Sequence, residues 1–318
     1  MSDRPVVVTG AAGFIGSNLV RRLLEDGRRV VGVDDLSTGS LANLSEARDR
    51  HPGRFEFDRL DVTAGGLTPL VERLRPELIY HLAAQVDVRR SVEDPLADAT
   101  TNVLGTVAVC EAAARGGVRK IIYASSIGSY GEPREDQLPV GESFLDPALS
   151  PYGASKRAAM TYLATYQALH GVSWTALTLA NVYGPGQTTA GEGGVVATFV
   201  GRMLAGQPVT IHGDGEQTRD FVFVDDVVHA FVLAADRGDD ERFTIGTGER
   251  ISINQLFRAL AAATEYPHEA TPAAARPGEI RHSAVDSSRA ARELGWKPWT
   301  TLEEGLAATL AWAAATER

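Results

Sequence analysis

Cysteine is almost absent from this sequence. Its 318 residues include one cysteine, Cys110, so an internal disulfide is excluded. Cys110 lies in an alanine-rich stretch with helical periodicity, between Val109 and Ala112. We therefore expect a small buried side chain rather than a catalytic thiol.

Long apolar runs are also absent. No uninterrupted apolar stretch approaches the roughly 20 residues that a helix needs to cross a bilayer. The opening residues MSDRPVVVTG run straight into an expected strand, without the charged and apolar segments of a leader peptide. We expect a cytoplasmic protein that has no membrane partner.

Positive charge is in deficit. The chain has 31 lysines and arginines against 41 aspartates and glutamates, which gives a net charge of -10. Such a chain repels phosphate backbones on average, so we expect no nucleic-acid partner. The seven histidines are scattered and form no His-x-x-x-His pair, so no metal site is predicted.

The sequence does contain a repeated alternation of short apolar runs with segments of helical periodicity. The runs are rich in β-branched residues and read PVVVTG, RRVVGVDD, FEFDRLDV, ELIYHLAA, RKIIYASS and SWTALTLAN. This alternation predicts a parallel sheet covered by helices on both faces, which is a doubly wound α/β fold.

The pattern loosens after residue 180, at the glycine-rich stretch NVYGPGQTTAGEGG. It resumes with a helix at 195–204 and with strands at PVTIHG and FVFVDD. Two capped helices close the chain: Asp286 precedes SSRAARELG, and Thr301 with Glu304 forms a capping box.

Two domains are expected from the length and from this change of pattern. A nucleotide-binding domain would cover residues 1–179, with 219–247 returning to it. A smaller α/β substrate-binding domain would contain residues 180–218 and 248–318.

Three glycines follow the first expected strand. Gly10, Gly13 and Gly16 are three residues apart, and a helix is expected to begin near Ser17. Bare backbone at this point lets a pyrophosphate approach the helix N-terminus. A tight strand-to-helix turn is the alternative, but the strand before and the helix after are the context that a dinucleotide site requires.

The second expected strand ends at Asp34, about 20 residues after the glycines. A carboxylate there can accept hydrogen bonds from both hydroxyls of an adenosine ribose, and it would repel a 2′-phosphate. No lysine or arginine follows within DDLSTGS, so NAD is favoured over NADP. Asp61 and Val62 follow the third strand and could meet the adenine edge, although a turn role for Asp61 is an equal alternative.

Tyr152 and Lys156 are four residues apart in SPYGASKRAAMTYL. On a helix they would share a face, and an ammonium beside a phenol would favour ionisation of the phenol. The fifth strand ends in Ser125 and Ser126, at the sheet edge where ligands of such folds bind. A chance pair on a helix face and a turn serine are the alternatives.

Several of these stretches together resemble the extended short-chain dehydrogenase/reductase family. They are TGAAGFIG, HLAAQ, YASS and YGASK, and the likeness covers nearly the whole chain. The resemblance implies a Rossmann fold with bound NAD, with Tyr152 as acid/base, Lys156 on the nicotinamide ribose and Ser126 on the reacting oxygen. The implied cofactor residues are Gly10, Gly13, Phe14, Ile15, Gly16, Asp34, Asp61, Val62, Leu82, Ala83, Ala84, Asn102, Tyr152 and Lys156.

Later stretches resemble the UDP-galactose 4-epimerases of this family. They are LANVYGPGQ, GDGEQTRDFVFVDDV and ARPGEI. The planar forks of two arginines could hold a diphosphate, and a glutamate could bind ribose hydroxyls; surface ion pairs are the alternative. The implied substrate-binding residues are Ser126, Asn181, Val195, Arg219, Arg276, Glu279 and Ser283.

The resemblance also narrows the reaction. Related dehydratases and decarboxylases usually carry an acid directly after the active-site serine or threonine, where this chain has Ile127 and Gly128. We therefore expect epimerisation at carbon 4 of a UDP-hexose through a 4-keto intermediate. A dehydratase, decarboxylase or uronate 4-epimerase is the enzymatic alternative, and an NAD-sensing regulatory protein is the non-enzymatic one.

Two features bear on substrate breadth and assembly. Ser283 stands where epimerases vary between a bulky aromatic residue and a small one, so room for an N-acetylamino group is expected. The helices DATTNVLGTVAVCEAAARGG and YGASKRAAMTYLATYQALHG carry more small and apolar residues than one sheet face can cover. They predict a homodimer with a four-helix contact.

Overall fold

The computed structural model describes residues 4–188, 194–275 and 280–316. Its main element is a seven-stranded sheet in the order β11-β6-β5-β4-β1-β2-β3, and its strands are parallel, as the sequence predicts. The strands of this sheet are β1 (Val6–Thr9), β2 (Val30–Asp34), β3 (Phe55–Arg59), β4 (Leu78–His81), β5 (Lys120–Ser126), β6 (Ser173–Leu179) and β11 (Glu241–Ile245).

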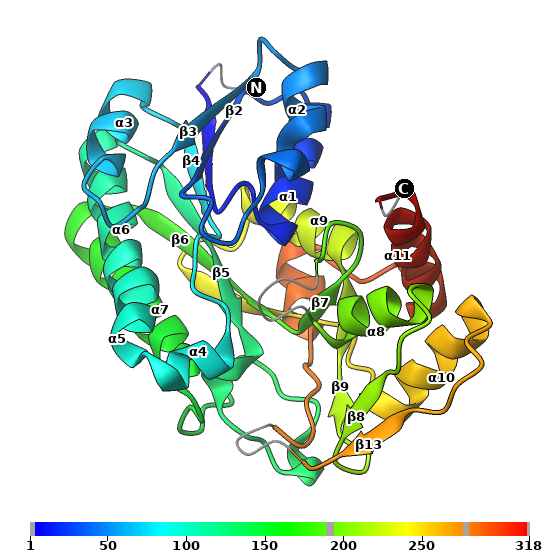
Figure 1. Ribbon diagram of the computed structural model, residues 1–318. Coiled ribbons are helices and arrows are strands. Elements are labelled where there is room, and N and C mark those ends of the chain that lie inside the picture. Colours follow the sequence, from blue (N-terminus) through cyan, green and yellow to red (C-terminus); the bar gives the residue numbers. More distant parts are fainter. Residues whose placement is uncertain (1–3, 189–193, 276–279, 317–318) are drawn as a thin grey trace.

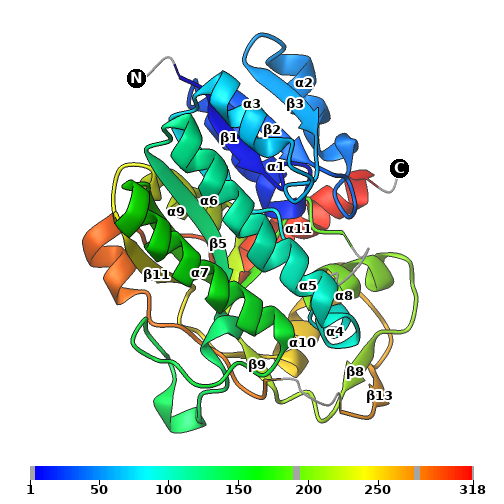
Figure 2. The ribbon, with the colours of Figure 1, turned by 90° about the vertical axis from the view of Figure 1, so that its left-hand side faces the viewer.

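Helices cover both faces of the sheet, so its central strands are buried on both sides (Figure 1). One face carries α3 (Leu67–Leu74), α6 (Gly105–Gly116) and α7 (Pro151–His170), of which α6 and α7 face the viewer in Figure 2. The other face carries α1 (Phe14–Glu25), α2 (Ser45–Arg50) and α9 (Val224–Ala234).

Strand order reverses between β1 and β4, which both pair with parallel neighbours. In doubly wound sheets, ligands bind outside the carboxyl ends of the strands at this reversal. The loops after β1, β4 and β5 therefore surround the expected binding position.

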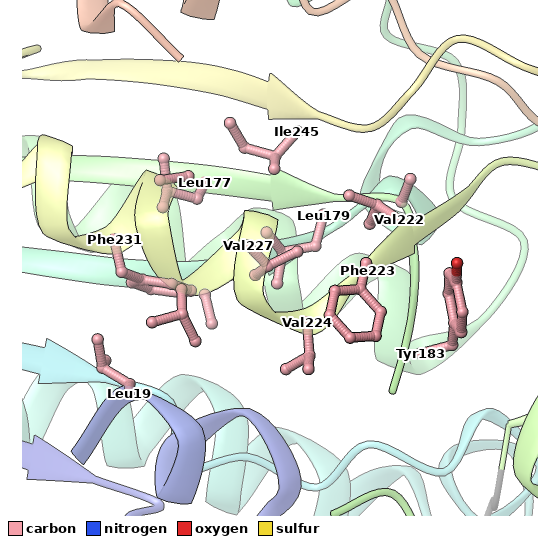
Figure 3. Packing of buried hydrophobic residues seen from close by; sticks show 14 of the residues in the cluster. Leu19, Leu177, Leu179, Tyr183, Val222, Phe223, Val224, Val227, Phe231 and Ile245 are labelled. Carbon is pink, nitrogen blue, oxygen red and sulfur yellow. The ribbon is translucent and has the colours of Figure 1, made fainter. Parts of the chain in front are cut away.

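The core of the α9 face is apolar and continuous. Val224, Val227 and Phe231 of α9 belong to one buried cluster with Leu177 of β6 and Leu19 of α1, whose side chains Figure 3 shows. Burial of these side chains joins β11 and α9, which come late in the chain, to the sheet formed by the first 179 residues.

The remaining strands form three two-stranded sheets beside the main sheet (Figure 1). They are β7 (Asn181–Tyr183) with β10 (Phe221–Phe223), β9 (Thr218–Arg219) with β12 (Ile251–Ser252), and β8 (Thr210–His212) with β13 (Thr271–Ala273). The helices of this region are α8 (Val195–Leu204), α10 (Ile253–Thr264) and α11 (Leu302–Thr316).

The strand predicted at FVFVDD is shorter than expected. It ends at Phe223, and Asp225 and Asp226 lie in the first turn of α9. Carboxylates are favoured there because the helix N-terminus carries partial positive charge. The capping box before α11 is confirmed, since Thr301 Oγ1 accepts from Glu304 N at 3.3 Å and Thr301 N donates to Glu304 Oε2 at 2.9 Å.

Candidate active site

The glycine-rich loop after β1 packs tightly against the segment that follows β4. Gly10 has a φ of +71°, and a Cβ atom there would lie 2.7 Å from Ala83 N. A Cβ atom on Gly16 would lie 2.0 Å from the carbonyl oxygen of Gly10. Only glycine fits at these two positions, because the loop packs against the segment after β4 and against itself.

Gly13 is the N-cap of α1, and Phe14 and Ile15 are its first two residues. Both side chains are half-buried. Because glycine has no side chain to cap the helix, the first backbone N–H groups of α1 can bind an anion. This arrangement fits the pyrophosphate of a dinucleotide.

Asp34 ends β2 beside this loop and is buried. Its Oδ2 accepts from Ala12 N at 2.9 Å, and its Oδ1 accepts from Leu36 N at 2.8 Å. Burial raises the pKa of Asp34, while these two hydrogen bonds oppose the shift. The carboxylate is therefore oriented by backbone, as a ribose-binding group must be.

Asp61 and Val62 differ from each other. Asp61 is exposed, and its Oδ1 accepts from Thr63 N at 2.8 Å and from Thr63 Oγ1 at 2.7 Å. This is the turn role that stood as the alternative for Asp61. Val62 is buried and packs in the core on the α3 and α6 side of the sheet.

Leu82, Ala83 and Ala84 follow β4 and are half-buried. Thr9 holds the segment in place, because Leu82 N donates to its carbonyl oxygen at 3.1 Å and Ala83 N to its hydroxyl at 3.3 Å. The predicted cofactor residues after β1 and after β4 are thus joined at the end of β1.

His81 lies directly beneath this segment and was not singled out by the sequence. Its Nδ1 is 2.8 Å from Thr9 Oγ1, and its Nε2 is 3.1 Å from Thr106 Oγ1. Burial, together with the charge of Lys156, lowers the pKa of His81 to about 3. His81 is therefore a neutral group that fixes the end of β4.

Asn102 is buried, and both the oxygen and the nitrogen of its side-chain amide are hydrogen-bonded. Its Oδ1 accepts from Gln85 N at 2.9 Å, and its Nδ2 lies 3.1 Å from Asp98 Oδ1 and 3.0 Å from Ser155 Oγ. Asn102 therefore joins the loop after β4 to α7. The sequence predicts Asn102 as a cofactor residue, but it did not single out Gln85, Asp98 or Ser155.

Local sequence places Tyr152 in the first turn of α7. Ser150 is the N-cap and its Oγ accepts from Gly153 N at 3.2 Å, while Pro151 occupies a position where proline favours helix initiation. Lys156 follows one turn later and is buried. The expected shared helix face is present, with Lys156 Nζ 5.9 Å from the centroid of the Tyr152 ring.

Lys156 Nζ donates to the carbonyl oxygen of Ala124 at 3.0 Å and lies 5.0 Å from the centroid of the Tyr123 ring. Burial lowers the pKa of Lys156 to about 8, and the negative charge of Asp98 opposes the shift. Lys156 thus remains mostly protonated at neutral pH, although it has been removed from water.

Ser126 ends β5, and its Oγ accepts from Gly128 N at 3.2 Å. A Cβ atom on Gly128 would lie 3.6 Å from Ser126 Oγ and 3.8 Å from Tyr152 Cδ1. The two side chains therefore flank the same glycine. Ser126, Tyr152 and Lys156 come together at the carboxyl edge of the sheet.

Apart from Ser126, the predicted substrate residues lie after residue 180. Arg219 Nη1 donates to the carbonyl oxygen of Thr218 at 2.9 Å, and Ser283 N donates to the same oxygen at 3.2 Å, so Arg219 and Ser283 are neighbours. Asn181 begins β7 and Val195 begins α8, and both are half-buried. Arg276 and Glu279 lie outside the described residues.

Arg219 lies among further basic side chains. The charges of Arg250, Arg281 and Arg219 all act on His282, whose pKa is lowered mainly by burial. Arg281 is itself held by Asp214, with N–O distances of 2.7 and 2.8 Å. Arg250 is likewise paired with Glu135 at 2.8 Å, so carboxylates already hold two of the basic side chains near Arg219.

A buried carboxylate, Asp220, was missed by the sequence analysis. Its Oδ1 accepts from Thr247 N and Thr247 Oγ1, both at 2.8 Å, and its Oδ2 accepts from Gly248 N at 2.9 Å and Val285 N at 3.2 Å. Burial raises the pKa of Asp220, and these hydrogen bonds oppose the shift. Asp220 fixes the segment that carries Ser283 to the strand that follows Arg219.

Metal-binding clusters and membrane-spanning helices are both absent from the described parts of the chain. No group of three or more histidine, cysteine, aspartate or glutamate side chains in residues 4–188, 194–275 and 280–316 could hold a metal ion. None of the helices in those ranges has the length and apolar character required to cross a membrane.

Comparison with known proteins gives matches along nearly the whole chain. Residues 6–246 match the NAD dependent epimerase/dehydratase family. UDP-glucose 4-epimerase from Mycolicibacterium smegmatis is 48% identical over 306 residues, which cover 96% of each chain.

Two solved structures are similar at the level of the whole fold. UDP-glucose 4-epimerase from Thermotoga maritima, in a crystal structure with UDP-glucose, has a TM-score of 0.94 and 41% identity, over 99% of this chain and 100% of that one. UDP-N-acetylglucosamine 4-epimerase from Methanobrevibacter ruminantium, in complex with UDP-N-acetylmuramic acid, has a TM-score of 0.92 and 31% identity over the same shares.

Proposed function

Because the chain belongs to the NAD dependent epimerase/dehydratase family, we propose that it interconverts UDP-glucose and UDP-galactose by epimerisation at carbon 4. The observation that carries this proposal is the placement of Tyr152 above a buried, protonated Lys156 at the carboxyl edge of the sheet. The 48% identity with a UDP-glucose 4-epimerase, over 96% of both chains, supports the same reaction.

The residues of the glycine loop and Asp34 would hold the cofactor. The N-terminus of α1, which Gly13 leaves without a side-chain cap, would bind the pyrophosphate, and the oriented carboxylate of Asp34 would accept hydrogen bonds from ribose hydroxyls while repelling a 2′-phosphate. A bound NAD would supply the hydride chemistry at carbon 4, as acceptor and then as donor.

The chain's own residues move the proton and hold the sugar oxygen. The phenolate of Tyr152 accepts the proton of the 4-hydroxyl as the 4-keto sugar forms, and the phenol returns the proton when the hydroxyl is restored. The ammonium of Lys156 favours the phenolate through its charge. Ser126 donates a hydrogen bond to the oxygen on carbon 4.

The residues after Ser126 favour epimerisation over dehydration. Ile127–Tyr130 form a short helical turn without an acidic side chain, and Gly128 occupies the space between Ser126 and Tyr152. Elimination of water from carbons 5 and 6 needs an acid and a base beside those atoms. A dehydratase, decarboxylase or uronate 4-epimerase stays the second candidate.

The nucleotide and the sugar would be held by different residues. Arg219, together with Arg276, binds the diphosphate, Glu279 binds the uridine ribose, and Asn181 and Val195 contact the substrate. Ser283 is small and buried beside Arg219, which leaves room for an acetamido group on carbon 2. The likeness to a UDP-N-acetylglucosamine 4-epimerase supports activity on both kinds of sugar.

A homodimer is part of the proposal. Five apolar side chains are more than 40% exposed on the helices at and before α7, namely Val92, Leu96, Leu104, Tyr162 and Leu169. A second copy of the same helices would cover them in a four-helix contact. Sedimentation at micromolar concentration tests this, and Leu96→Asp should shift the protein toward monomer whereas the exposed Leu145→Asp should not.

We also propose a division into two domains and a cellular location. We assign residues 1–179 and 219–247 to the nucleotide-binding domain, and 180–218 and 248–318 to the substrate-binding domain. A cytoplasmic location agrees with the single cysteine, which is buried and whose thiol pKa is raised to about 12 by burial.

A panel of nucleotide sugars tests the reaction. The purified protein is incubated separately with UDP-glucose, UDP-N-acetylglucosamine, UDP-glucuronate and dTDP-glucose, and the products are separated. We expect the galacto-configured products of the first two sugars. A 4-keto-6-deoxy product from dTDP-glucose, without epimerisation of the UDP-sugars, would contradict the proposal and favour a dehydratase.

A further inference from the structure

Asp98 is a buried carboxylate that the proposed mechanism does not use. It lies in α5 (Pro95–Ala99) with 1% of its surface exposed. Its Oδ1 accepts from Gln85 Nε2 at 2.9 Å and from Asn102 Nδ2 at 3.1 Å. Its Oδ2 is buried and has no hydrogen-bond partner among the described residues. A buried carboxylate is costly unless charge or hydrogen bonds compensate it, so its position calls for an explanation.

A chain of hydrogen bonds leads from Asp98 to the catalytic turn of α7. Asn102 Nδ2 lies 3.0 Å from Ser155 Oγ, and Ser155 Oγ donates to the carbonyl oxygen of Tyr152 at 2.9 Å. The Asn102 amide donates to the Asp98 carboxylate and to the Ser155 hydroxyl, and that hydroxyl donates to the carbonyl oxygen of Tyr152. Three links therefore separate Asp98 from the proposed acid/base.

The same carboxylate acts on Lys156 through its charge. Four titratable groups face or influence this lysine from the elements around it: His81 on β4, Tyr123 on β5, Asp98 on α5 and Tyr152 on α7. His81 is neutral because its pKa is lowered to about 3, and burial holds Tyr123 as a phenol because its pKa is raised well above the usual value. Of these four groups, Asp98 is the one whose charge raises the pKa of Lys156.

We propose that Asp98 is a positioning residue whose buried carboxylate orients Asn102 and, through Ser155, the backbone of Tyr152, and acts electrostatically on Lys156, which directly follows Ser155. This inference rests on the proposed roles of Tyr152 and Lys156, but an effect of Asp98 on Lys156 does not depend on whether the protein is an epimerase. It can therefore be measured without any substrate.

Asp98→Asn isolates the charge, because the amide keeps an oxygen that accepts from Gln85 and Asn102. Lys156 has a lowered pKa in the folded chain, so the unfolded chain binds more protons between about pH 8 and the usual lysine value of 10.5. The free energy of unfolding therefore rises with pH across this window. Removing the negative charge should move the start of the window to lower pH, by about one unit.

The test is a double-mutant cycle on the full chain. Wild type, Asp98→Asn, Lys156→Met and the double variant are unfolded by urea at several pH values from 6 to 10. At pH 7, Asp98→Asn should change the unfolding equilibrium about tenfold more in the wild-type background than in the Lys156→Met background, and its pH-dependent part should vanish in the latter. Equal losses in both backgrounds, without a pH-dependent part, would overturn the proposal.

Catalysis supplies a second readout. The alkaline limb of the kcat/KM profile should move to lower pH in Asp98→Asn by about one unit, because Lys156 loses its proton earlier. Glu72→Gln makes the same charge change on the exposed face of α3 and should leave the limb in place. A uniform fall in kcat at every pH would show that Asp98 acts only by holding the backbone. A protein without epimerase activity but with the coupled stability change would contradict the proposed function and leave the role of Asp98 standing.

Discussion

The two halves of the molecule, residues 4–179 and the described residues from 180 on, hold their side chains by different means. In the first half, the candidate site is shaped by bare backbone at the glycine loop, which packs against Ala83, and by the Ser150 cap of α7. In the second half, Asp220 binds backbone N–H groups 27, 28 and 65 positions away. Asp226 likewise accepts from Trp299 N and Thr300 N, more than 70 positions away.

This difference decides how each half responds to change. A site made by local steric fit fails when a side chain is added, whereas a site held by buried carboxylates fails when an acceptor is removed. Substitutions in the first half should act on cofactor binding and chemistry, and those in the second should act on the substrate. The predictions below test that separation.

The largest effect is expected from Tyr152→Phe, which deletes one hydroxyl in the first half of the molecule. Turnover should fall by about 10²–10⁴ because general acid/base catalysis is worth that much. The free energy of unfolding and the content of bound NAD should stay as in wild type, since the ring is kept. Turnover within tenfold of wild type would remove Tyr152 from its proposed role.

Gly16→Ala should give the next largest effect. The added Cβ would lie 2.0 Å from the carbonyl oxygen of Gly10, where ordinary contact begins at about 3.4 Å, so the glycine loop would have to move. We expect a loss of roughly 3 kcal/mol in unfolding free energy, together with loss of co-purified NAD. Calorimetry and the ultraviolet absorbance of the released cofactor measure the two quantities.

Gly53→Ala is the matched control for this variant. A Cβ atom there meets nothing within 4 Å, and Gly53 is exposed. Its stability should stay within about 0.5 kcal/mol of wild type. If both alanine variants bind NAD equally, the tight contact between Gly16 and Gly10 does not shape the cofactor site.

Asp220→Asn tests the second half of the molecule, the described residues from 180 on. An amide turns one of the two acceptor oxygens into a donor facing other donors, so at least one pair of hydrogen bonds is lost inside the core. We expect a loss of about 2–3 kcal/mol in unfolding free energy and a raised KM for the UDP-sugar, with NAD affinity unchanged. Urea unfolding, steady-state kinetics and NAD titration measure these three.

Asp214→Asn serves as the control for Asp220→Asn. Asp214 is exposed and paired with Arg281, and exposed ion pairs contribute little to stability. No measurable change in the urea midpoint is expected. A fall in NAD affinity in Asp220→Asn would contradict the separation of the two halves.

The sequence predicts the first half of the molecule well because the sequence patterns of that half are short-range. The glycine spacing, the apolar strand runs and the four-residue spacing of Tyr152 and Lys156 all follow from the periods of strands and helices. Gly10, Asp34 and Lys156 therefore lie in the predicted elements, after β1, at the end of β2 and on α7, and the six strands predicted before residue 180 are present.

Residues that act through distant partners were missed for the same reason. Asp98 faces Gln85 from 13 positions away, and Asp220 faces Val285 from 65 positions away. A carboxylate in a sequence looks the same whether it lies in water or beneath a backbone loop. The strand at FVFVDD was predicted too long because Val224 suits either a strand or the first turn of α9, and packing in the core decides between them.

The smallest effect is expected in the second half of the molecule, as a change of selectivity between UDP-N-acetylglucosamine and UDP-glucose. Ser283 is buried next to Arg219, and a tyrosine there would fill the space proposed for the group on carbon 2. One filled pocket volume typically changes discrimination by about 1–3 kcal/mol, or roughly 10- to 200-fold. Ser283→Tyr should therefore lose kcat/KM for UDP-N-acetylglucosamine by this factor while keeping activity on UDP-glucose.

Ser283→Ala is the control, because it keeps the space and should act on both sugars as wild type does. Equal loss on both sugars would show that the tyrosine disturbs the fold around Thr218 rather than the pocket. Absence of N-acetyl activity in the wild type would mean that other residues, such as the buried Thr178, limit the size of the sugar.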